Sequence, residues 1–162
     1  MRLKTLSFDA LKIISQECKC KNLTTVWTNG CFDIMHAGHI KYLRRAANAG
    51  DVLIVGLNTD ESVVKNKGPG RPIMNQEDRA LVLSSLEFVD YILLWDGKDF
   101  DEVLRGLKPN YYVKGGDYTI DTVVQTERKI VENYGGKILL FSGVEGISTT
   151  EIITKIRKGS NE

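Results

Sequence analysis

Apolar residues follow two different spacings, which alternate along the chain. Short continuous runs of apolar residues are typical of buried strands, because both faces of such a strand are covered. Apolar residues three or four positions apart, with polar residues between them, are typical of helices that bury one face. Strands are predicted at residues 24–28, 51–57, 89–95, 111–113 and 137–141.

Helices are predicted between these strands, and several carry signals at their ends. Thr59 and Asn75 are placed to cap helices with their side chains, whereas Gly50 and the Gly135-Gly136 pair are placed to end them. Helices are expected at residues 8–18, 40–47, 59–64, 76–86, 99–107 and 123–134, and a late helix is expected to begin at Ser148.

Strands that alternate with helices predict an α/β fold, namely a Rossmann-like, doubly wound parallel sheet. A chain of 162 residues, 42% of them hydrophobic, fits a single domain with a sizeable core. We expect residues 1–23 to form a leading helix and linker, residues 24–158 the domain and residues 159–162 a tail. Ligands of this fold class bind at the carboxyl ends of the strands.

Charge and composition exclude several broad classes of function. With 22 basic and 21 acidic residues and a net charge of +1, nothing favours general attraction to nucleic acid or to a membrane surface. No apolar run reaches membrane-spanning length, and residues 1–4 lead into an amphipathic segment, so we expect a cytoplasmic protein. The three cysteines are too few for a disulfide framework or a thiolate zinc site, and no metal ligands are predicted.

The two histidines of the chain, His36 and His39, lie where a predicted strand gives way to a predicted helix. Free backbone N–H groups and the helix dipole favour an anion at such a position. Gly38 lets a large anion approach the backbone, and imidazole N–H groups can donate to phosphate oxygens. A phosphate contact is favoured over a purely structural role, and metal ligation is less favoured than either.

A cationic segment from Lys65 to Pro72 is expected to be a loop. Lys65, Lys67 and Arg71 lie in it, together with two glycines. It is either a solvated turn or a cover for phosphate groups, which would otherwise repel one another. Arg79 is equally well placed to bind phosphate or to pair with a neighbouring carboxylate.

Two further segments have both a structural and a functional interpretation. Ser148 to Glu151 fits a capping box, and the same hydroxyl and N–H groups at Ser148, Thr149 and Thr150 would hold a phosphate. Asp33 either binds hydroxyl groups of an acceptor or caps the turn that precedes the helix.

These segments together resemble a known family. His36 to His39 resembles the HxGH signature of the nucleotidyltransferase superfamily, and Ile147 to Thr150 resembles its second, I-S-T-T signature. Residues 65–72, 76–79 and 113–118 are most similar to the adenylyltransferase domains that make ADP-activated heptose in bacteria. The resemblance runs in order from about Thr25 to Ile156, which implies that residues 24–158 form a nucleotidyltransferase domain.

The resemblance implies a reaction and a set of site residues. An acceptor sugar phosphate would attack the α-phosphorus of a nucleoside triphosphate and release pyrophosphate, with Mg²⁺ bound through the nucleotide phosphates. Members of the family often form dimers, so a homodimer is one expectation. The catalytic residues would be His36, His39 and Lys67. The nucleotide and its phosphates would contact Asn29, Gly30, Cys31, Phe32, Gly38, Arg79, Gly115, Asp117, Ser148, Thr149 and Thr150. The acceptor would contact Asp33, Lys65, Arg71 and Lys114.

Two alternatives remain open at this point. The first is a glycerol-3-phosphate-type cytidylyltransferase that uses CTP, because residues 145–150 match that group as well. The second is a nucleotide-binding module without turnover. The sequence encodes neither the base that is used, nor the sugar phosphate and its anomer, nor the oligomeric state.

Overall fold

The structure is a computed structural model that describes residues 4–97, 99–116, 118–142 and 148–159. The predicted site residue Asp117, the Ile147 position of the second signature and the end of the predicted tail lie outside the described residues.

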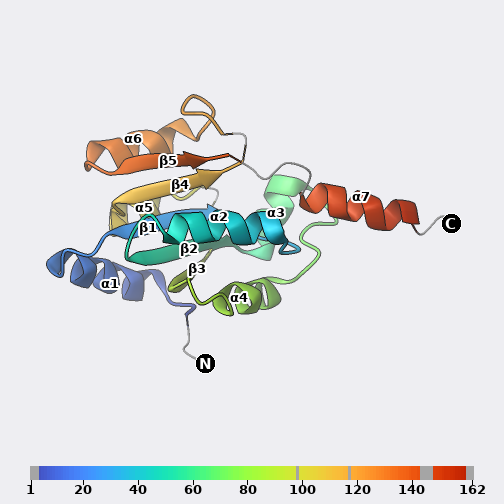
Figure 1. Cartoon of the computed structure of the whole chain (residues 1–162), viewed down its shortest axis with the longest axis horizontal. Coiled ribbons are helices and arrows are strands. Elements are labelled where there is room, and N and C mark those ends of the chain that lie inside the picture. The colour runs from blue at the N-terminus through green and yellow to red at the C-terminus, as the bar shows by residue number, and fades with distance from the viewer. Residues whose placement is uncertain (1–3, 98, 117, 143–147, 160–162) are drawn as a thin grey trace.

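Five parallel strands form one sheet in the order β3-β2-β1-β4-β5 (Figure 1). Helices connect the strands, so the expected Rossmann-like, doubly wound α/β fold is confirmed. The expected strand positions agree to within a few residues at each end. The strands span Thr25–Gly30 (β1), Val52–Asn58 (β2), Tyr91–Trp95 (β3), Tyr111–Gly115 (β4) and Lys137–Phe141 (β5).

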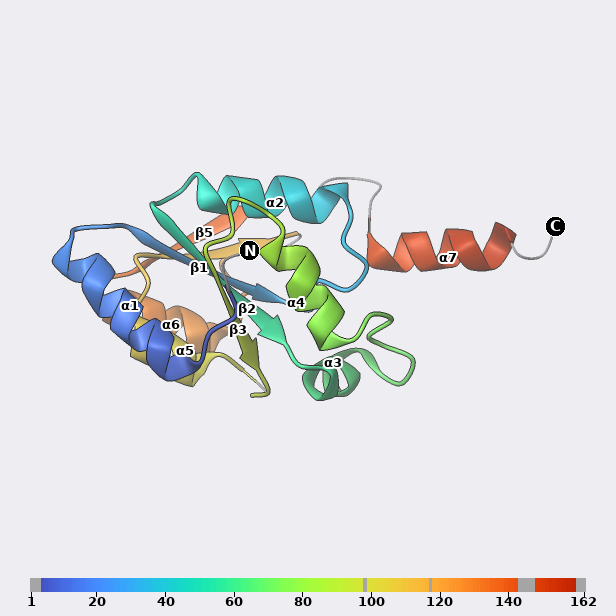
Figure 2. The ribbon, with the colours of Figure 1, turned by 90° about the horizontal axis from the view of Figure 1, so that it is seen from below.

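Helices cover both faces of the sheet. On one face, Leu43 and Leu83 come from α2 and α4 and pack against β1 and β2. On the other face, Leu11, Leu104 and Val131 come from α1, α5 and α6 (Figure 2). The helices span Phe8–Cys20 (α1), Ala37–Ala47 (α2), Asp60–Lys67 (α3), Gln76–Ser84 (α4), Asp101–Leu107 (α5), Gln125–Asn133 (α6) and Thr149–Gly159 (α7).

Helix α3 is longer than the apolar spacing predicts. Thr59 caps it as expected, by accepting a hydrogen bond from the backbone N–H of Ser62. The helix then continues past Val64 to Lys67 and ends at Gly68, whose φ of 86° is easy only for glycine. Lys65 and Lys67 therefore lie in the last turn of a helix, and the expectation that they belong to a loop was wrong.

Helix α7 projects from the body of the protein (Figures 1 and 2). None of its described residues is buried. Its first turn is attached to the body, because the Thr149 hydroxyl donates to the carbonyl oxygen of Asp33 at 2.8 Å. Among the described residues, no helix combines the length and the apolar character that crossing a bilayer requires.

The segment that leads into the sheet is packed on it. Leu11 of α1 is fully buried among residues of α5 and the sheet. The backbone of Lys4 and Leu6 forms hydrogen bonds with Ile92 of β3. The leading helix thus shares the core of the sheet.

Truncation of a buried residue in α1 tests whether this helix belongs to the cooperative fold. We expect Leu11→Ala to lower the free energy of unfolding by about 2–5 kcal/mol, because it leaves a cavity in the shared core. Ile13, which is 59% exposed on the same helix, provides the control, and Ile13→Ala is expected to change stability by about 0.5 kcal/mol or less. Urea unfolding measures both, and equal small losses would show that α1 is separable from the core.

Candidate active site

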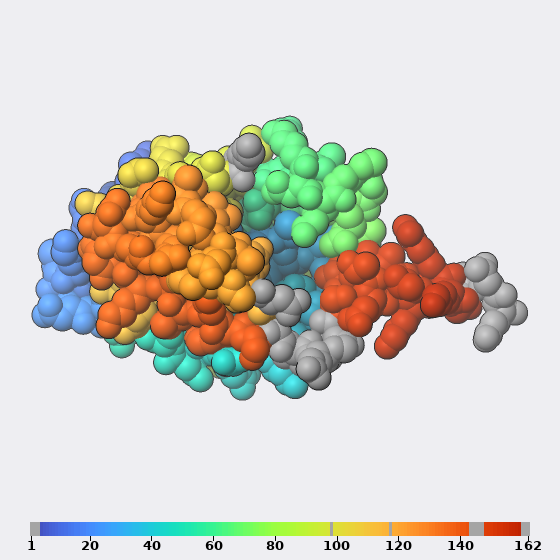
Figure 3. Space-filling view, turned by 90° about the horizontal axis from the view of Figure 1, so that it is seen from above, coloured from blue at the N-terminus to red at the C-terminus, as the bar shows by residue number. Residues whose placement is uncertain are grey.

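The carboxyl ends of β1, β2 and β4 meet at one edge of the sheet. Strands β2 and β3 are added to the sheet on one side of β1, and strands β4 and β5 on the other side, so the strand order reverses direction at β1. Such a switch point is where open α/β sheets bind ligands. Figure 3 shows a hollow between the orange segment around α6, the green segment around α3 and red α7, with blue and cyan atoms on its floor.

The turn between β1 and α2 has an unusual backbone. Phe32 and Ile34 adopt φ values of 46° and 51°, which non-glycine residues seldom take. Phe32 is buried at 5% exposure, so the turn is packed into the core from one side. Surrounding contacts must hold such a conformation in place.

Asp33, between these two residues, supplies those contacts. Its carboxylate accepts hydrogen bonds from Arg71 Nε at 2.7 Å and from the backbone N–H groups of Ile73 at 2.9 Å and Met74 at 3.0 Å. Burial alone would raise the pKa of this carboxyl, but the N–H groups of Met74 and Ile73 and the Arg71 guanidinium outweigh it and lower the pKa.

The geometry gives Asp33 a structural role in place of the expected acceptor contact. The Asp33 side chain has 0% exposure, and three N–H donors occupy its two oxygens. It therefore presents no oxygen to a hydroxyl group of an acceptor. It ties the turn after β1 to the segment that precedes α4.

The two histidines lie together at the start of α2. His36 is the N-cap residue, and its Nδ1 accepts from the backbone N–H of Gly38 at 3.1 Å. The proton of the neutral His36 ring is therefore on Nε2. The ring centroids of His36 and His39 are 3.9 Å apart, and the edge of Phe32 packs on His39. Among the described residues, the buried Nδ1 of His39 has no hydrogen-bond partner.

Both histidines are uncharged at neutral pH. Burial and, to a smaller extent, the neighbouring His36 lower the pKa of His39 to about 4, against the opposing effect of Asp33. Burial also lowers the pKa of His36, against the effect of Glu151 on α7. The pair therefore presents neutral N–H donors and acceptors, not two positive charges.

The Arg79 side chain is buried and forms hydrogen bonds with other groups of the protein. It has 0% exposure. Its guanidinium donates to Asp60 Oδ1 at 2.6 Å, to the carbonyl oxygen of Cys31 at 2.6 Å and to that of Met74 at 3.0 Å. Of the two expectations for Arg79, the geometry favours pairing with a carboxylate over binding phosphate. The guanidinium fixes the carbonyl of Cys31 from beneath the turn.

Positive charge gathers beside Cys31. Burial raises the pKa of the Cys31 thiol, and Lys67, Arg79 and Arg71 act against this shift. Lys67 is exposed at the end of α3, and Arg71 is 19% exposed. Lys65 is also exposed on the last turn of α3. Lys67 and Arg71 thus keep part of their surface free beside the histidine turn.

The start of α7 lies against the histidine turn. Ser148 caps the helix, because its Oγ accepts from the backbone N–H of Glu151 at 3.1 Å. The Thr149 hydroxyl is occupied by the carbonyl oxygen of Asp33, whereas Thr150 is exposed. The expected capping hydrogen bond from the Glu151 N–H to Ser148 is therefore present.

The end of β4 brings Gly115 and Lys114 to the same edge. A Cβ atom on Gly115 would come within 2.4 Å of the Tyr42 ring, so a larger residue does not fit beside α2. The Tyr42 hydroxyl donates to the carbonyl oxygen of Val113 at 3.0 Å and also bonds with the Thr28 hydroxyl. Tyr42 thereby joins α2 to β1 and β4 below the site.

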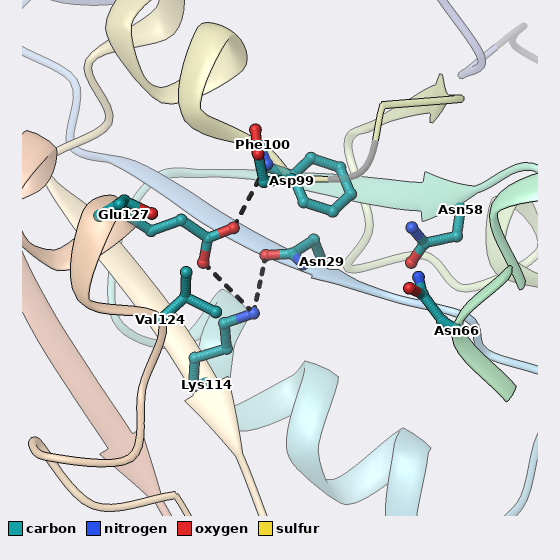
Figure 4. Close-up of a pocket in the computed structure, with 9 residues that line it drawn as sticks. Asn29, Asn58, Asn66, Asp99, Phe100, Lys114, Val124 and Glu127 are labelled. Atoms are coloured by element: carbon teal, nitrogen blue, oxygen red, sulfur yellow. Dashed lines mark hydrogen bonds and ion pairs between the residues drawn. The ribbon is translucent and has the colours of Figure 1, made fainter.

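A polar pocket of about 400 Å³ lies beside the strand ends, on the side of α5 and α6 (Figure 4). Its lining includes the amides of Asn29, Asn58 and Asn66, the Lys114 ammonium and the Glu127 carboxylate. Sequence reasoning missed Asn58, Asn66 and Glu127. Asn58 is a polar residue at the end of the buried strand β2, and this position was the signal that could have identified it as a site residue.

The doubly wound sheet, with paired histidines at a helix start on its switch point, defines a nucleotidyltransferase-type fold. A family model described as Cytidylyltransferase-like matches residues 27–155. The chain belongs to this family.

Curated relatives share much of the sequence. The bifunctional protein HldE of Geobacter sulfurreducens is 44% identical over 98% of this chain, and that of Geotalea uraniireducens is 45% identical over 97%. Each match covers 32% of the relative, so this chain spans about a third of the length of these proteins.

Solved structures agree on the fold. The lipopolysaccharide core biosynthesis protein from Thermoplasma volcanium matches with a TM-score of 0.61 and 28% identity, over 75% of this chain and 97% of that one. Pantoate-beta-alanine ligase from Francisella tularensis matches with a TM-score of 0.62 over 99% of this chain and 80% of that one. At 16% identity, this second match shows the fold alone.

The lowered pKa values of the two partly buried histidines predict how stability depends on pH. An unfolded chain protonates His39 near the ordinary value of 6.5, but the folded chain does so only at about 4. The unfolded state therefore binds more protons between these values, so the free energy of unfolding falls as pH drops through this window. We expect His39→Gln to remove most of this fall, and His36 to account for a smaller remainder in the same direction.

Denaturant unfolding between neutral pH and pH 4, together with an NMR titration of the two rings, measures this effect. A midpoint near 6.5 for the His39 ring would contradict it.

Proposed function

We propose that this chain transfers the adenylyl group of ATP to a sugar 1-phosphate, most specifically heptose 1-phosphate, and releases pyrophosphate. The observation that carries the proposal is the convergence of two neutral histidines, the α7 start and the Lys67 and Arg71 cations at the switch point of the sheet. The resemblance to heptose-activating adenylyltransferase domains and the HldE relatives support the choice of acceptor.

The chemistry needs no covalent intermediate and no general base. An oxygen of the acceptor phosphate attacks the α-phosphorus of ATP, and the bond from that phosphorus to the bridging oxygen of the β-phosphate breaks. The electron pair of that bond leaves with pyrophosphate. The attacking phosphate is already anionic at neutral pH, so no proton has to be removed from it, and the buried Asp33 is not required as a base.

Catalysis in this proposal is positioning and charge neutralisation. His36 Nε2–H, on the N-cap residue of α2, would donate to phosphate oxygens that meet the start of this helix, and the His39 ring packs beside it. The backbone N–H groups at the start of α7 meet the same oxygens from the other side. Lys67 and Arg71 balance the charge of the two substrates, which would otherwise repel one another.

Mg²⁺ supplies further neutralisation of phosphate charge when it is bound. The described residues hold no group of three or more His, Cys, Asp or Glu side chains that could bind a metal ion. N–H donors already surround the Asp33 carboxylate at the site. This donor set fits a metal that arrives with the nucleotide and is held by its phosphate oxygens and by water.

A glycerol-3-phosphate-type cytidylyltransferase is the second candidate. The Cytidylyltransferase-like description of the matching family favours it, as does the start of α7 at Ser148 to Thr150. The two candidates share the phosphate chemistry and differ in base and acceptor.

Replacement of one histidine tests the mechanism. We expect His39→Ala to lower turnover roughly a hundredfold or more, as the loss of a preorganised donor does at similar sites. Lys41→Ala, at an exposed position on the same helix, is the matched control and should retain wild-type turnover. Near-wild-type turnover of a folded His39→Ala variant would remove the histidines from the mechanism.

Pyrophosphate release tests the reaction itself. The protein is incubated with Mg²⁺ and heptose 1-phosphate, and ATP, CTP and GTP are offered separately. Release with ATP alone is the expected result. No release with any of the three, followed by release from CTP with glycerol 3-phosphate, would select the second candidate. If neither assay releases pyrophosphate and the protein still binds nucleotide, the chain is a nucleotide-binding module without turnover.

A further inference from the structure

Glu127 is an acidic residue on a buried face. It lies on α6 with only 2% exposure, one turn before the buried Ile130 and Val131. Its carboxylate accepts from the Tyr112 hydroxyl and from the backbone N–H of Phe100 at 3.3 Å. A buried carboxylate is costly to keep unless it is paired and hydrogen-bonded. Because an apolar residue at this position would avoid that cost, Glu127 calls for a reason beyond packing.

The partner of Glu127 in the pocket is Lys114. The Nζ atom of Lys114 lies 3.8 Å from Glu127 Oε2 and donates to Asn29 Oδ1 at 3.2 Å (Figure 4). The Lys114 side chain is 9% exposed and lines the pocket. Burial lowers the pKa of this ammonium and Glu127 raises it. Glu127 thus both orients the lysine and favours its protonated form.

The charges of this pocket differ from those at the histidine turn. Among the residues that the structure describes, the pocket lining contains one cation, Lys114, and the carboxylates of Glu127 and Asp99, besides its three asparagine amides. This balance disfavours a phosphate. Amides both donate and accept hydrogen bonds, as sugar hydroxyl groups do. The partly exposed cations Lys67 and Arg71 lie instead beside Cys31.

We propose that Glu127 is a positioning residue for acceptor recognition. It holds the Lys114 ammonium among the pocket amides, so that Lys114 donates to hydroxyl groups of the sugar part of the acceptor. This inference rests on the proposed function and adds a residue that selects a polyhydroxylated acceptor. Tyr112 and Phe100 fix the carboxylate, and the carboxylate fixes the lysine.

A double-mutant cycle tests whether Glu127 acts through Lys114. Glu127→Gln keeps the shape and an oxygen acceptor but removes the charge. We expect it to raise the KM for the sugar phosphate roughly tenfold or more, as the loss of a charged hydrogen bond does, with the KM for ATP unchanged. In a Lys114→Met background, Glu127→Gln should add no further rise.

Glu132→Gln is the matched control on the same helix. Glu132 pairs with Arg128 at 2.9 Å, and its side chain is 50% exposed, so its replacement should change neither KM. Equal rises in both KM values, or independent effects of Glu127→Gln and Lys114→Met, would overturn the proposal. If Glu127→Gln does not fold, Tyr112→Phe is the substitute, because it removes one donor to the Glu127 carboxylate. We expect Tyr112→Phe to raise the KM for the sugar phosphate by a smaller factor, and to cause no rise in the Lys114→Met background.

The reactivity of Lys114 provides a measurement that does not depend on turnover. Without Glu127, a larger fraction of Lys114 is the free amine, so acetic anhydride should acetylate it faster in Glu127→Gln than in Glu132→Gln. Mass spectrometry of peptides measures the rate. Equal rates overturn the role of Glu127 even if the enzyme is active. Faster acetylation in a protein that releases no pyrophosphate would support the pairing while the proposed function fails.

Discussion

The buried carboxylate of Asp33 is the interaction on which the site depends. It accepts hydrogen bonds from Arg71 and from the N–H groups of Ile73 and Met74. The backbone carbonyl oxygen of Asp33 also accepts a hydrogen bond from the Thr149 hydroxyl. One residue thereby joins the turn after β1, the segment before α4 and the start of α7. The positive φ values of its neighbours persist because these bonds hold them.

This junction explains why the histidines are uncharged. The turn packs Phe32 and His39 against the core, and the ring of His36 covers His39, so both rings lose hydration and stay neutral. A neutral ring donates one hydrogen bond without attracting a counter-ion before the substrate arrives. Positive charge comes instead from Lys67 and Arg71, which remain partly exposed and can meet phosphates without losing all of their own hydration.

The sequence predicted the order of elements well, because each strand and helix has its own local apolar spacing. It misplaced the end of α3, since Lys65 and Lys67 carry no apolar signal although the helix continues to Gly68. The partners of Asp33 lie about forty positions away in the chain, and those of Arg79 up to 48 positions away. Local patterns contain no information about such contacts, so a structural carboxylate resembled a binding residue. Glu127 was missed for the same reason.

The two halves of the site come from opposite faces of the sheet. The histidines and the start of α7 belong to the α2 side, whereas Glu127 and Phe100 belong to the side of α5 and α6. Strand β1 lies between the halves and ends at Asn29 and Gly30. In the proposed function, the histidines that contact phosphate lie on the α2 side of β1, and Glu127, which positions Lys114 for the acceptor, lies on the α6 side. A change of residues on α6 would then alter acceptor recognition and leave the phosphate-binding histidines in place.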